Sequence, residues 1–208
     1  DERDQHIAPS INDLSCEEWD KTYGAIYKEC INSGVKTIMI GHIMQPAYTR
    51  YFCPDIDDHD IMPATVNKYL VTNLLREKLG LNGLIITDST TMAGIAAMLP
   101  REKMVPLTIA AGCDMFLFTK CLEEDLAYMK KGYEDGVFTR ERLDDAVLRI
   151  LALKASLKLH EKQKNGTLVP RLEDAKKIIG NEKFISWSKE CADKATTLVK
   201  EEKGVLPI

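Results

Sequence analysis

Residues 63–92, PATVNKYLVTNLLREKLGLNGLIITDSTTM, join a predicted helix to a predicted strand and decide the fold class. Val66, Leu70 and Leu74 recur at helical spacing, and Gly80 is a typical residue just beyond a helix end. Residues 84–87, LIIT, are too hydrophobic for a strand with one face in water, and are typical of a parallel strand covered by helices. The stretch therefore predicts an α/β unit whose strand ends at a carboxylate, Asp88.

The same alternation of helix and strand continues on both sides of this unit. A capping box of Ser15 and Glu18 begins a predicted helix that ends near Gly34, and residues 36–41 predict a strand. Residues 43–62 contain two prolines and no periodicity, and predict a long loop. Residues 101–112 predict a short helix broken by Pro106, followed by a strand at 113–118.

Three parallel strands covered by helices place the chain in the α/β class. They are too few for an eight-stranded barrel, which needs about 250 residues. The residues alone therefore leave two possibilities open, a small open sheet or the C-terminal part of a barrel. After the third strand, the chain is predicted to be helical at 122–133, 139–159 and 172–199, with a polar linker at 162–170.

Composition narrows the classes of function. The net charge is −4, and the sequence has no lysine or arginine stripe interleaved with aromatic residues, which argues against nucleic acid as a partner. No apolar run approaches the roughly 18 residues that cross a bilayer. The six cysteines show neither C-x-x-C pairs nor zinc-like spacing, so we expect free thiols, which favour a reducing, cytoplasmic compartment. Because both ends resemble cuts in a longer polypeptide, the natural location is left open.

Polar residues follow all three predicted strands: His42, Asp88, and Thr119 with Lys120. The carboxyl edge of a parallel sheet is where α/β proteins bind ligands. A buried carboxylate at this edge is costly unless it has donors or a partner charge, so Asp88 is a candidate catalytic residue. The alternative is that Asp88 only caps the following helix, which the sequence DSTT also permits.

Two further groups of polar residues are candidates for chemistry. Asp4 and His6 are two residues apart, and a carboxylate that orients an imidazole makes a proton-transfer pair near neutral pH. The alternative is a solvated loop with an ordinary histidine. The acidic run DIDDHD at 55–60 could hold a hard cation, but it lacks the spacing and glycine of an EF-hand, so we favour a solvated loop and predict no metal.

Residues 63–95 resemble the signature of glycoside hydrolase family 3. In that family a helix of the type P-A-T…L-L-R-E-x-L-G precedes a strand G-x-x-x-T-D, with Met four residues after the Asp; Thr87, Asp88 and Met92 occupy these places. The resemblance implies that residues 1–160 are the C-terminal part of a (β/α)8 barrel, with strands six, seven and eight. It also implies that residues 161–208 are a helical linker leading to an α/β sandwich domain.

The resemblance also implies roles for particular residues. Asp88 takes the place of the catalytic nucleophile. Asp4, Gln5 and His6 resemble the Asp-x-His dyad of the N-acetylglucosaminidase-like branch, with His6 as acid/base and Asp4 as its orienting partner. Gln5 departs from the branch's serine, and we expect it to have no chemical role. His42 and Met92 are expected to line the sugar subsite; the alternatives are a histidine hydrogen-bonded in the barrel rim and a methionine that fills the core. No cofactor is implied.

The predicted function is hydrolysis of terminal β-linked sugars, with N-acetyl-β-D-glucosamine as the expected sugar, through a covalent glycosyl-aspartate and retention of configuration. One alternative is a phosphorylase, because a neutral imidazole does not repel phosphate as a carboxylate does. Others are a β-glucosidase whose carboxylate acid/base lies in a second domain, and a fragment inactive by itself. The predicted partner is a carbohydrate; the aglycone and oligomeric state stay open.

Overall fold

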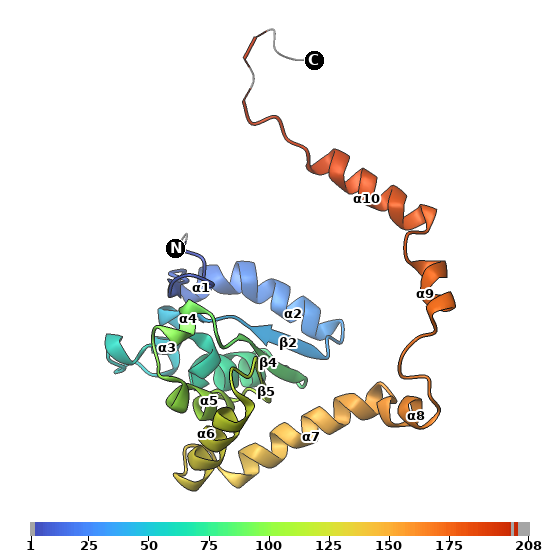
Figure 1. Ribbon diagram of the computed structural model, residues 1–208. Helices are drawn as coiled ribbons and strands as arrows, with labels where there is room; N and C mark the ends of the chain where they lie inside the picture. Colours follow the sequence, from blue (N-terminus) through green and yellow to red (C-terminus); the bar gives the residue numbers. More distant parts are fainter. Residues whose placement is uncertain (1–2, 201, 204–208) are drawn as a thin grey trace. The chain divides into compact units, whose positions relative to one another are not determined.

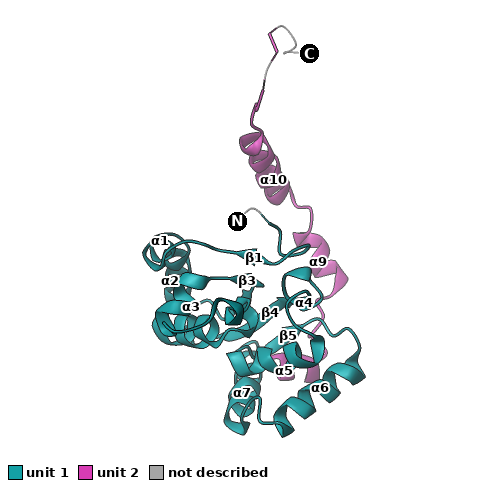
Figure 2. Cartoon of the chain, turned by 90° about the vertical axis from the view of Figure 1, so that its left-hand side faces the viewer, with its two compact units in different colours: residues 1–157 teal, residues 158–208 magenta. Residues whose placement is uncertain are grey.

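The helix and the strand predicted within residues 63–92 are both present in the computed structural model, which describes residues 3–200 and 202–203. They are the π-helical segment η4 (Tyr69–Lys78) and the strand β4 (Leu84–Ser89). The chain divides into two compact units, Asp1–Leu157 and Lys158–Ile208 (Figure 2). Each unit is described by itself, and the assignment of the second to a linker stays a prediction.

β4 is the middle strand of a parallel sheet. β2 (Thr37–Ile40) pairs with it on one side and β5 (Met115–Leu117) on the other, giving the order β2-β4-β5 (Figure 1). Ile38 lies opposite Ile85, and Ile86 lies opposite Met115. The three predicted parallel strands are therefore confirmed. A short parallel pair that was not predicted joins β1 (Ser10–Ile11) to β3 (Ile43–Met44).

The first predicted helix runs from α1 (Cys16–Trp19) through the π-helical η1 (Asp20–Gly24) into α2 (Ala25–Asn32). Its capping box is formed as predicted. The Glu18 amide donates to Ser15 Oγ at 3.2 Å, and the Ser15 amide donates to the Glu18 carboxylate at 3.0 Å. Two of the backbone donors at this helix end are thereby satisfied.

The predicted loop at 43–62 is wrong in part, because it contains α3 (Pro46–Phe52), followed by the 3-10 turn η2 (Asp58–Asp60). The Gln45 side chain caps α3 by accepting a hydrogen bond from the Tyr48 amide at 2.5 Å. Pro46 suits the first helical position, where its missing N–H costs nothing. A second 3-10 turn, η3 (Ala64–Val66), leads into η4.

The predicted break at Pro106 is also wrong. After the short helix α4 (Ala93–Ala96), α5 runs from Arg101 to Ala111 through a buried Pro106. The reason lies in the neighbouring helix α6 (Leu122–Glu134), where a Cβ on Gly132 would lie 2.3 Å from the Pro106 Cβ. The proline ring packs directly on bare backbone, and this packing offsets the loss of one helical hydrogen bond. α7 (Arg140–Ser156) follows as predicted.

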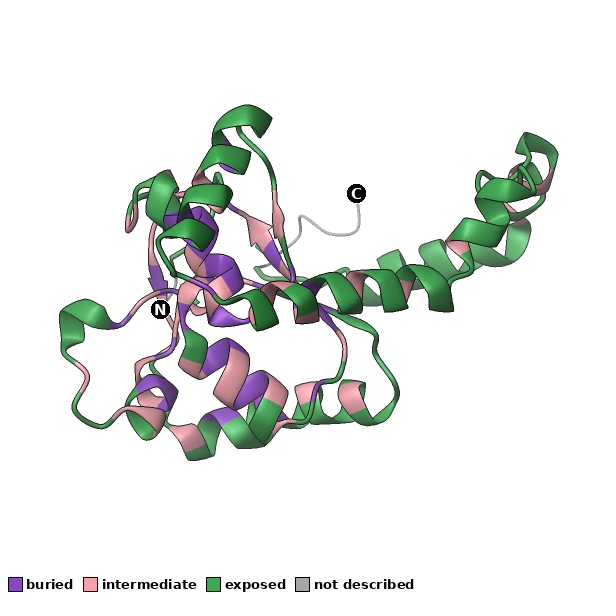
Figure 3. Ribbon diagram, turned by 90° about the horizontal axis from the view of Figure 1, so that it is seen from below, coloured by how far each residue is buried: buried purple, intermediate pink, exposed green. Residues whose placement is uncertain are grey.

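The main hydrophobic core lies between one face of the sheet and the helices that cover it (Figure 3). Its buried members come from β2, η4, the turn after η4, β4, the end of α5 and the turn before β5: Ile38, Ile40, Val71, Leu75, Leu81, Ile85, Ala111 and Cys113. On the opposite face Met39 is 53% exposed and Met115 is 37% exposed. Burial on one face therefore fixes β4 and the position of its carboxyl end.

The second unit contains α8 (Leu159–Lys164), α9 (Leu172–Ile178) and α10 (Glu182–Ala195). The helices predicted between 172 and 199 are thus present as two. In the described part of this unit, no residue reaches the buried class. Residues 204–208, at the end of the predicted linker, lie outside the described residues.

Asp114 joins the elements that surround the start of β4. Its side chain is 0% exposed and accepts hydrogen bonds from the Ile85 amide at 2.8 Å, Arg76 at 2.7 Å and Arg142 at 2.6 Å. Arg76 also donates to the carbonyls of Gly83 and Gly112, at 3.0 Å each. One carboxylate therefore connects η4, β4, β5 and α7.

We expect Asp114→Ala to destabilise the fold by about 3–5 kcal/mol, because it leaves two partly buried guanidinium groups and one buried amide without their shared acceptor. Urea unfolding followed by circular dichroism measures the change. The matched control is Asp144→Ala on α7, whose pair with Arg140 is exposed and should contribute no more than about 1 kcal/mol. Equal losses for both variants would contradict the role given to Asp114.

Candidate functional site

Asp88 lies near the carboxyl end of β4 and is half-buried. Its Oδ1 accepts a hydrogen bond from the Ser89 amide at 2.7 Å, and its Oδ2 accepts one from Gln5 Nε2 at 3.2 Å. With one donor on each oxygen, the plane of the carboxylate is fixed. The alternative role as a helix cap is not supported, because α4 begins only at Ala93 and Met92 is its N-cap residue.

Asp4 and His6 form the predicted pair. His6 Nδ1 lies 2.6 Å from the Asp4 carboxylate, which also accepts the His6 backbone amide at 2.9 Å. The backbone amide, and then the ring, hold the pKa of Asp4 below its ordinary value. Both side chains are exposed, at 66% for His6 and 59% for Asp4. His6 Nε2 has no hydrogen-bond partner among the described residues, so it is the nitrogen available for proton transfer.

The segment that carries this pair is docked against the start of α4. The Gly94 amide donates to the Gln5 carbonyl at 2.8 Å, and the Ala93 amide donates to the His6 carbonyl at 3.3 Å. A Cβ on Gly94 would lie 2.8 Å from the Gln5 carbonyl oxygen, so this close approach requires glycine. The structure thus brings Asp4, His6 and Asp88 to one edge of the sheet from distant parts of the chain.

His42 is fully buried beside the same edge. Its Nε2 lies 2.8 Å from the Ser89 carbonyl, and its Nδ1 lies 2.5 Å from the Thr65 hydroxyl. The carbonyl can only accept, so Nε2 carries the proton and Nδ1 accepts from Thr65. Burial lowers the pKa of His42, which is consistent with a neutral ring. Both ring nitrogens are occupied within the protein, and its predicted contact with a sugar stays a prediction.

Met92 is placed close to the site but is only 6% exposed. It is the N-cap residue of α4, and its amide donates to the Ser89 carbonyl at 3.1 Å. Little of its surface is available to a ligand in this arrangement. The predicted contact of Met92 with the substrate therefore also stays a prediction.

A second group of contacts braces the carboxyl ends of β4 and β5, and sequence reasoning missed it. Arg101 on α5 donates to the Thr90 hydroxyl at 3.1 Å and to the Phe118 carbonyl at 2.9 Å. The guanidinium also pairs with Asp125 at 2.5 Å, and the Asp125 side chain is 1% exposed. This ion pair fixes the loop that follows β5 against the residues just after Asp88.

The acidic run at 55–60 is exposed, and its hydrogen bond and ion pair stabilise the local turn. Asp57 caps η2 by accepting the His59 amide at 2.9 Å, and Arg50 pairs with Asp58. Within residues 3–200 and 202–203, no three His, Cys, Asp or Glu side chains are grouped to hold a metal ion.

All six cysteines are free thiols. No helix in the described ranges has the length and apolar character needed to span a bilayer.

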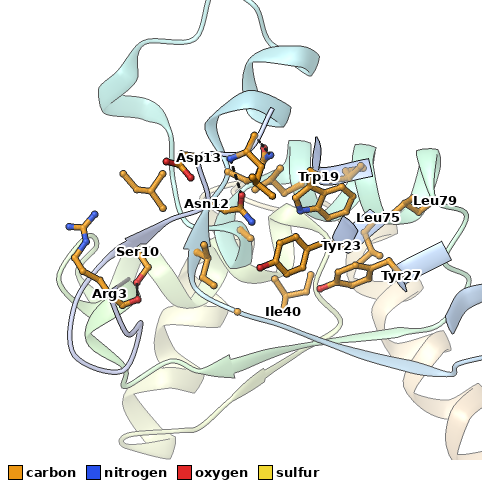
Figure 4. Close-up of a pocket in the computed structure, with 18 residues that line it drawn as sticks. Arg3, Ser10, Asn12, Asp13, Trp19, Tyr23, Tyr27, Ile40, Leu75 and Leu79 are labelled. Atoms are coloured by element: carbon orange, nitrogen blue, oxygen red, sulfur yellow. Dashed lines mark hydrogen bonds between the residues drawn. The ribbon is translucent and has the colours of Figure 1, made fainter. Parts of the chain in front are cut away.

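A cavity of about 480 Å³ lies in the first unit (Figure 4). Trp19, Tyr23 and Tyr27 line one part of it, and Ser10, Asn12 and Ile40 belong to its other walls. None of Asp4, His6, His42 or Asp88 contributes to this lining. Gly41, which precedes His42 and lies close to the Gln5 side chain, does line it, so the cavity lies next to the candidate site but includes none of these four side chains.

The sequence that forms the parallel sheet and its helices is similar to a known protein family. A model described as the glycosyl hydrolase family 3 N terminal domain matches residues 2–153. The chain belongs to glycosyl hydrolase family 3. The predicted fold class is thereby confirmed: β2, β4 and β5 with their helices are part of the (β/α)8 barrel domain of this family.

Named relatives of this family 3 chain include glycosidases and a phosphorylase. It is 54% identical over 208 residues to a β-N-acetylglucosaminidase/β-glucosidase of Cellulomonas fimi, covering 100% of the chain and 36% of the relative. It is 30% identical over 181 residues to β-hexosaminidase A of Pseudoalteromonas piscicida, covering 82% and 29%. A solved structure of the β-glucoside phosphorylase BglX bound to 2FGlc has a TM-score of 0.90 at 43% identity, covering 99% and 36%. The chain thus spans about a third of these relatives.

We expect the burial of His42 to make stability depend on pH. Because the folded-state pKa lies below 6.5, the unfolded chain binds a proton that the folded chain does not as pH falls below about 6.5. The contribution of neutral His42 to the free energy of unfolding is therefore present above about pH 6.5. It is lost as pH falls from that value towards the folded-state pKa of His42. Urea midpoints measured between pH 5 and 8 test this.

His42→Gln should remove that part of the slope. A His42→Gln variant with the same pH slope as the parent would contradict the assignment of a buried neutral ring.

Proposed function

We propose that the full-length protein is a retaining β-glycosidase in which Asp88 is the nucleophile and His6 is the acid/base. One observation carries this proposal. The Asp88 carboxylate stands at the carboxyl edge of the central parallel strand, and the Asp4–His6 pair is docked beside it through Gln5 and the start of α4. Carboxyl edges of barrel strands are where catalytic groups of such folds lie.

The chemistry proceeds in two displacements. In the first, an Asp88 oxygen bonds to the anomeric carbon while the bond from that carbon to the leaving oxygen breaks, and His6 gives the leaving oxygen its proton. In the second, water attacks the same carbon and loses a proton to His6, and the bond to Asp88 breaks. Two inversions give net retention of configuration.

Asp4 supports this exchange of protons. Its carboxylate lies on Nδ1 of His6, so that Nε2 is the nitrogen that faces outward for transfer. The negative charge of Asp4 also stabilises the imidazolium that forms when His6 acts as a base. The pair needs no metal or organic group for this role.

We propose a terminal N-acetyl-β-D-glucosamine as the preferred sugar. The relative from Cellulomonas fimi, at 54% identity, carries both β-N-acetylglucosaminidase and β-glucosidase in its name, and the Pseudoalteromonas piscicida relative is a β-hexosaminidase. Comparing aryl β-glycosides with and without the 2-acetamido group tests the preference. The activity is proposed for the full-length protein, and we expect the 208 residues alone, which span about a third of the relatives' length, to be inactive.

Phosphorolysis is a second candidate function. The chain is 43% identical to a β-glucoside phosphorylase with a TM-score of 0.90. A carboxylate acid/base is anionic in the second displacement and repels phosphate, whereas a neutral imidazole at His6 does not. Phosphate would then take the place of water, and the product would be a sugar 1-phosphate.

We expect Asp88→Asn to lower kcat/KM by at least about a thousandfold, because the amide cannot form the glycosyl intermediate. Hydrolysis of an aryl N-acetyl-β-glucosaminide by the full-length protein measures this. Asp193→Asn on α10, at an exposed position, is the matched control and should keep parental activity. Parental activity in Asp88→Asn would contradict the assigned nucleophile.

We expect His6→Gln to lower kcat/KM by about 10²–10⁴-fold for substrates whose leaving group needs a proton, because proton transfer contributes a factor of that size. An activated dinitrophenyl glycoside should be affected far less, since its leaving group departs unprotonated. His160→Gln, an exposed histidine of α8, is the control. An equal loss with both substrates would argue against His6 as the acid.

Adding inorganic phosphate to the parent enzyme separates the two candidate functions. Formation of N-acetylglucosamine 1-phosphate or glucose 1-phosphate, with a rate that rises with phosphate concentration, would establish phosphorolysis. Release of free sugar alone, at a rate independent of phosphate, would remove this option and leave hydrolysis.

A further inference from the structure

We infer that Gln5 is a positioning residue that holds the nucleophile Asp88 in its attacking orientation and fixes its place relative to His6. The inference rests on the proposed function, and it gives a role to the middle residue of the Asp4-Gln5-His6 segment, for which none was expected. Three hydrogen bonds carry it. They connect Gln5 to Asp88, to the end of β2 and to the start of α4.

The orientation of the Gln5 amide is determined by its neighbours. The His42 backbone amide, which can only donate, lies 2.5 Å from Gln5 Oε1. The oxygen end of the side chain must therefore face His42, which leaves the NH₂ end to face Asp88. Gln5 Nε2 is 3.2 Å from Asp88 Oδ2, so the nucleophile accepts a hydrogen bond from an uncharged donor.

The anchor on His42 is itself rigid. The His42 ring is held between the Thr65 hydroxyl and the Ser89 carbonyl, at 2.5 and 2.8 Å. Gly41 permits the approach, because a Cβ there would lie 3.0 Å from Gln5 Oε1. The amide of Gln5 is therefore fixed with respect to the ends of both β2 and β4.

The same residue connects the two catalytic groups. Its side chain bonds the nucleophile, and its backbone carbonyl accepts the Gly94 amide at 2.8 Å, which docks the segment that carries His6. Asp88 and His6 are consequently held by one residue at a defined separation. The hydrogen bond from Gln5 Nε2 stabilises negative charge on Asp88 Oδ2. It therefore stabilises the Asp88 carboxylate as this group leaves the anomeric carbon in the second displacement.

Two substitutions separate the donor from simple packing. Gln5→Glu keeps the length and the acceptor for the His42 amide, but replaces the donor by a carboxylate at neutral pH. Gln5→Met keeps a similar volume and removes both polar ends. Gln163→Glu and Gln163→Met, at an exposed position on α8, are the matched controls and should keep parental kinetics.

The two variants should respond to pH in opposite directions. In Gln5→Glu the introduced carboxyl regains a proton as pH falls and can again donate to Asp88, so kcat/KM relative to the parent should rise towards acid pH. In Gln5→Met the ionised nucleophile has lost a hydrogen-bond donor, so the acid side of the pH profile of kcat/KM should move to higher pH. The ratio of variant to parent should therefore fall towards acid pH. The titratable and charged groups around the site, namely Asp4, His6, His42 and Arg101, are common to all proteins compared.

At pH 7 we expect both variants to lose about 10–100-fold in kcat with a smaller change in KM, as for other residues that act through a reacting group. Opposite pH trends in the two ratios would support the inference, and a misfolded protein would not produce them. Parental kcat, or ratios that do not change with pH, would overturn it. If Asp88→Asn were fully active, the proposed function itself would fail; if Asp88→Asn were inactive but Gln5 variants were parental, only this inference would fail.

Discussion

Parallel pairing on both edges of β4 is the constraint on which the rest of the first unit depends. A strand with neighbours on either side and helices over one face is fixed in place, and its carboxyl end lies where parallel α/β folds bind ligands. Ile85 and Thr87 are 0% exposed, and the next residue is Asp88. The same pairing places the ends of β2 and β5 beside that carboxylate, so His42 and the loop after β5 are brought to the site by the sheet and not by local sequence.

Much of this arrangement could be predicted from local patterns. The capping box at Ser15 and Glu18 and the turn at Gly80, whose φ is +77°, are short-range signals and were confirmed. The helical break at Pro106 was wrong because its compensation comes from Gly132, on another helix. The buried carboxylate of Asp114 was missed for the same reason, since its three partners lie at least 28 residues away.

The candidate site shows the same difference between short-range sequence signals, which could be predicted, and long-range contacts, which could not. Asp88 could be singled out because its place at the end of an apolar strand is visible in the sequence, and the Asp4–His6 pair because a single residue separates its members. Gln5 could not, since its contact with Asp88 spans 83 positions and depends on glycine at 41 and 94. Because Gln5 differs from the family pattern at the centre of the Asp-x-His motif, it was expected to have no chemical role. In the structure it links Asp88, the segment that carries His6, and the sheet edge.

The central claim is that Asp88 becomes covalently attached to the anomeric carbon of the substrate. A 2-deoxy-2-fluoro glycoside with a good leaving group slows the second displacement more than the first, so the intermediate accumulates. After digestion, mass spectrometry should find the fluorosugar on the peptide that contains Asp88, and its release should accompany recovery of activity. An adduct on another carboxylate, or inactivation without any adduct, would contradict the account.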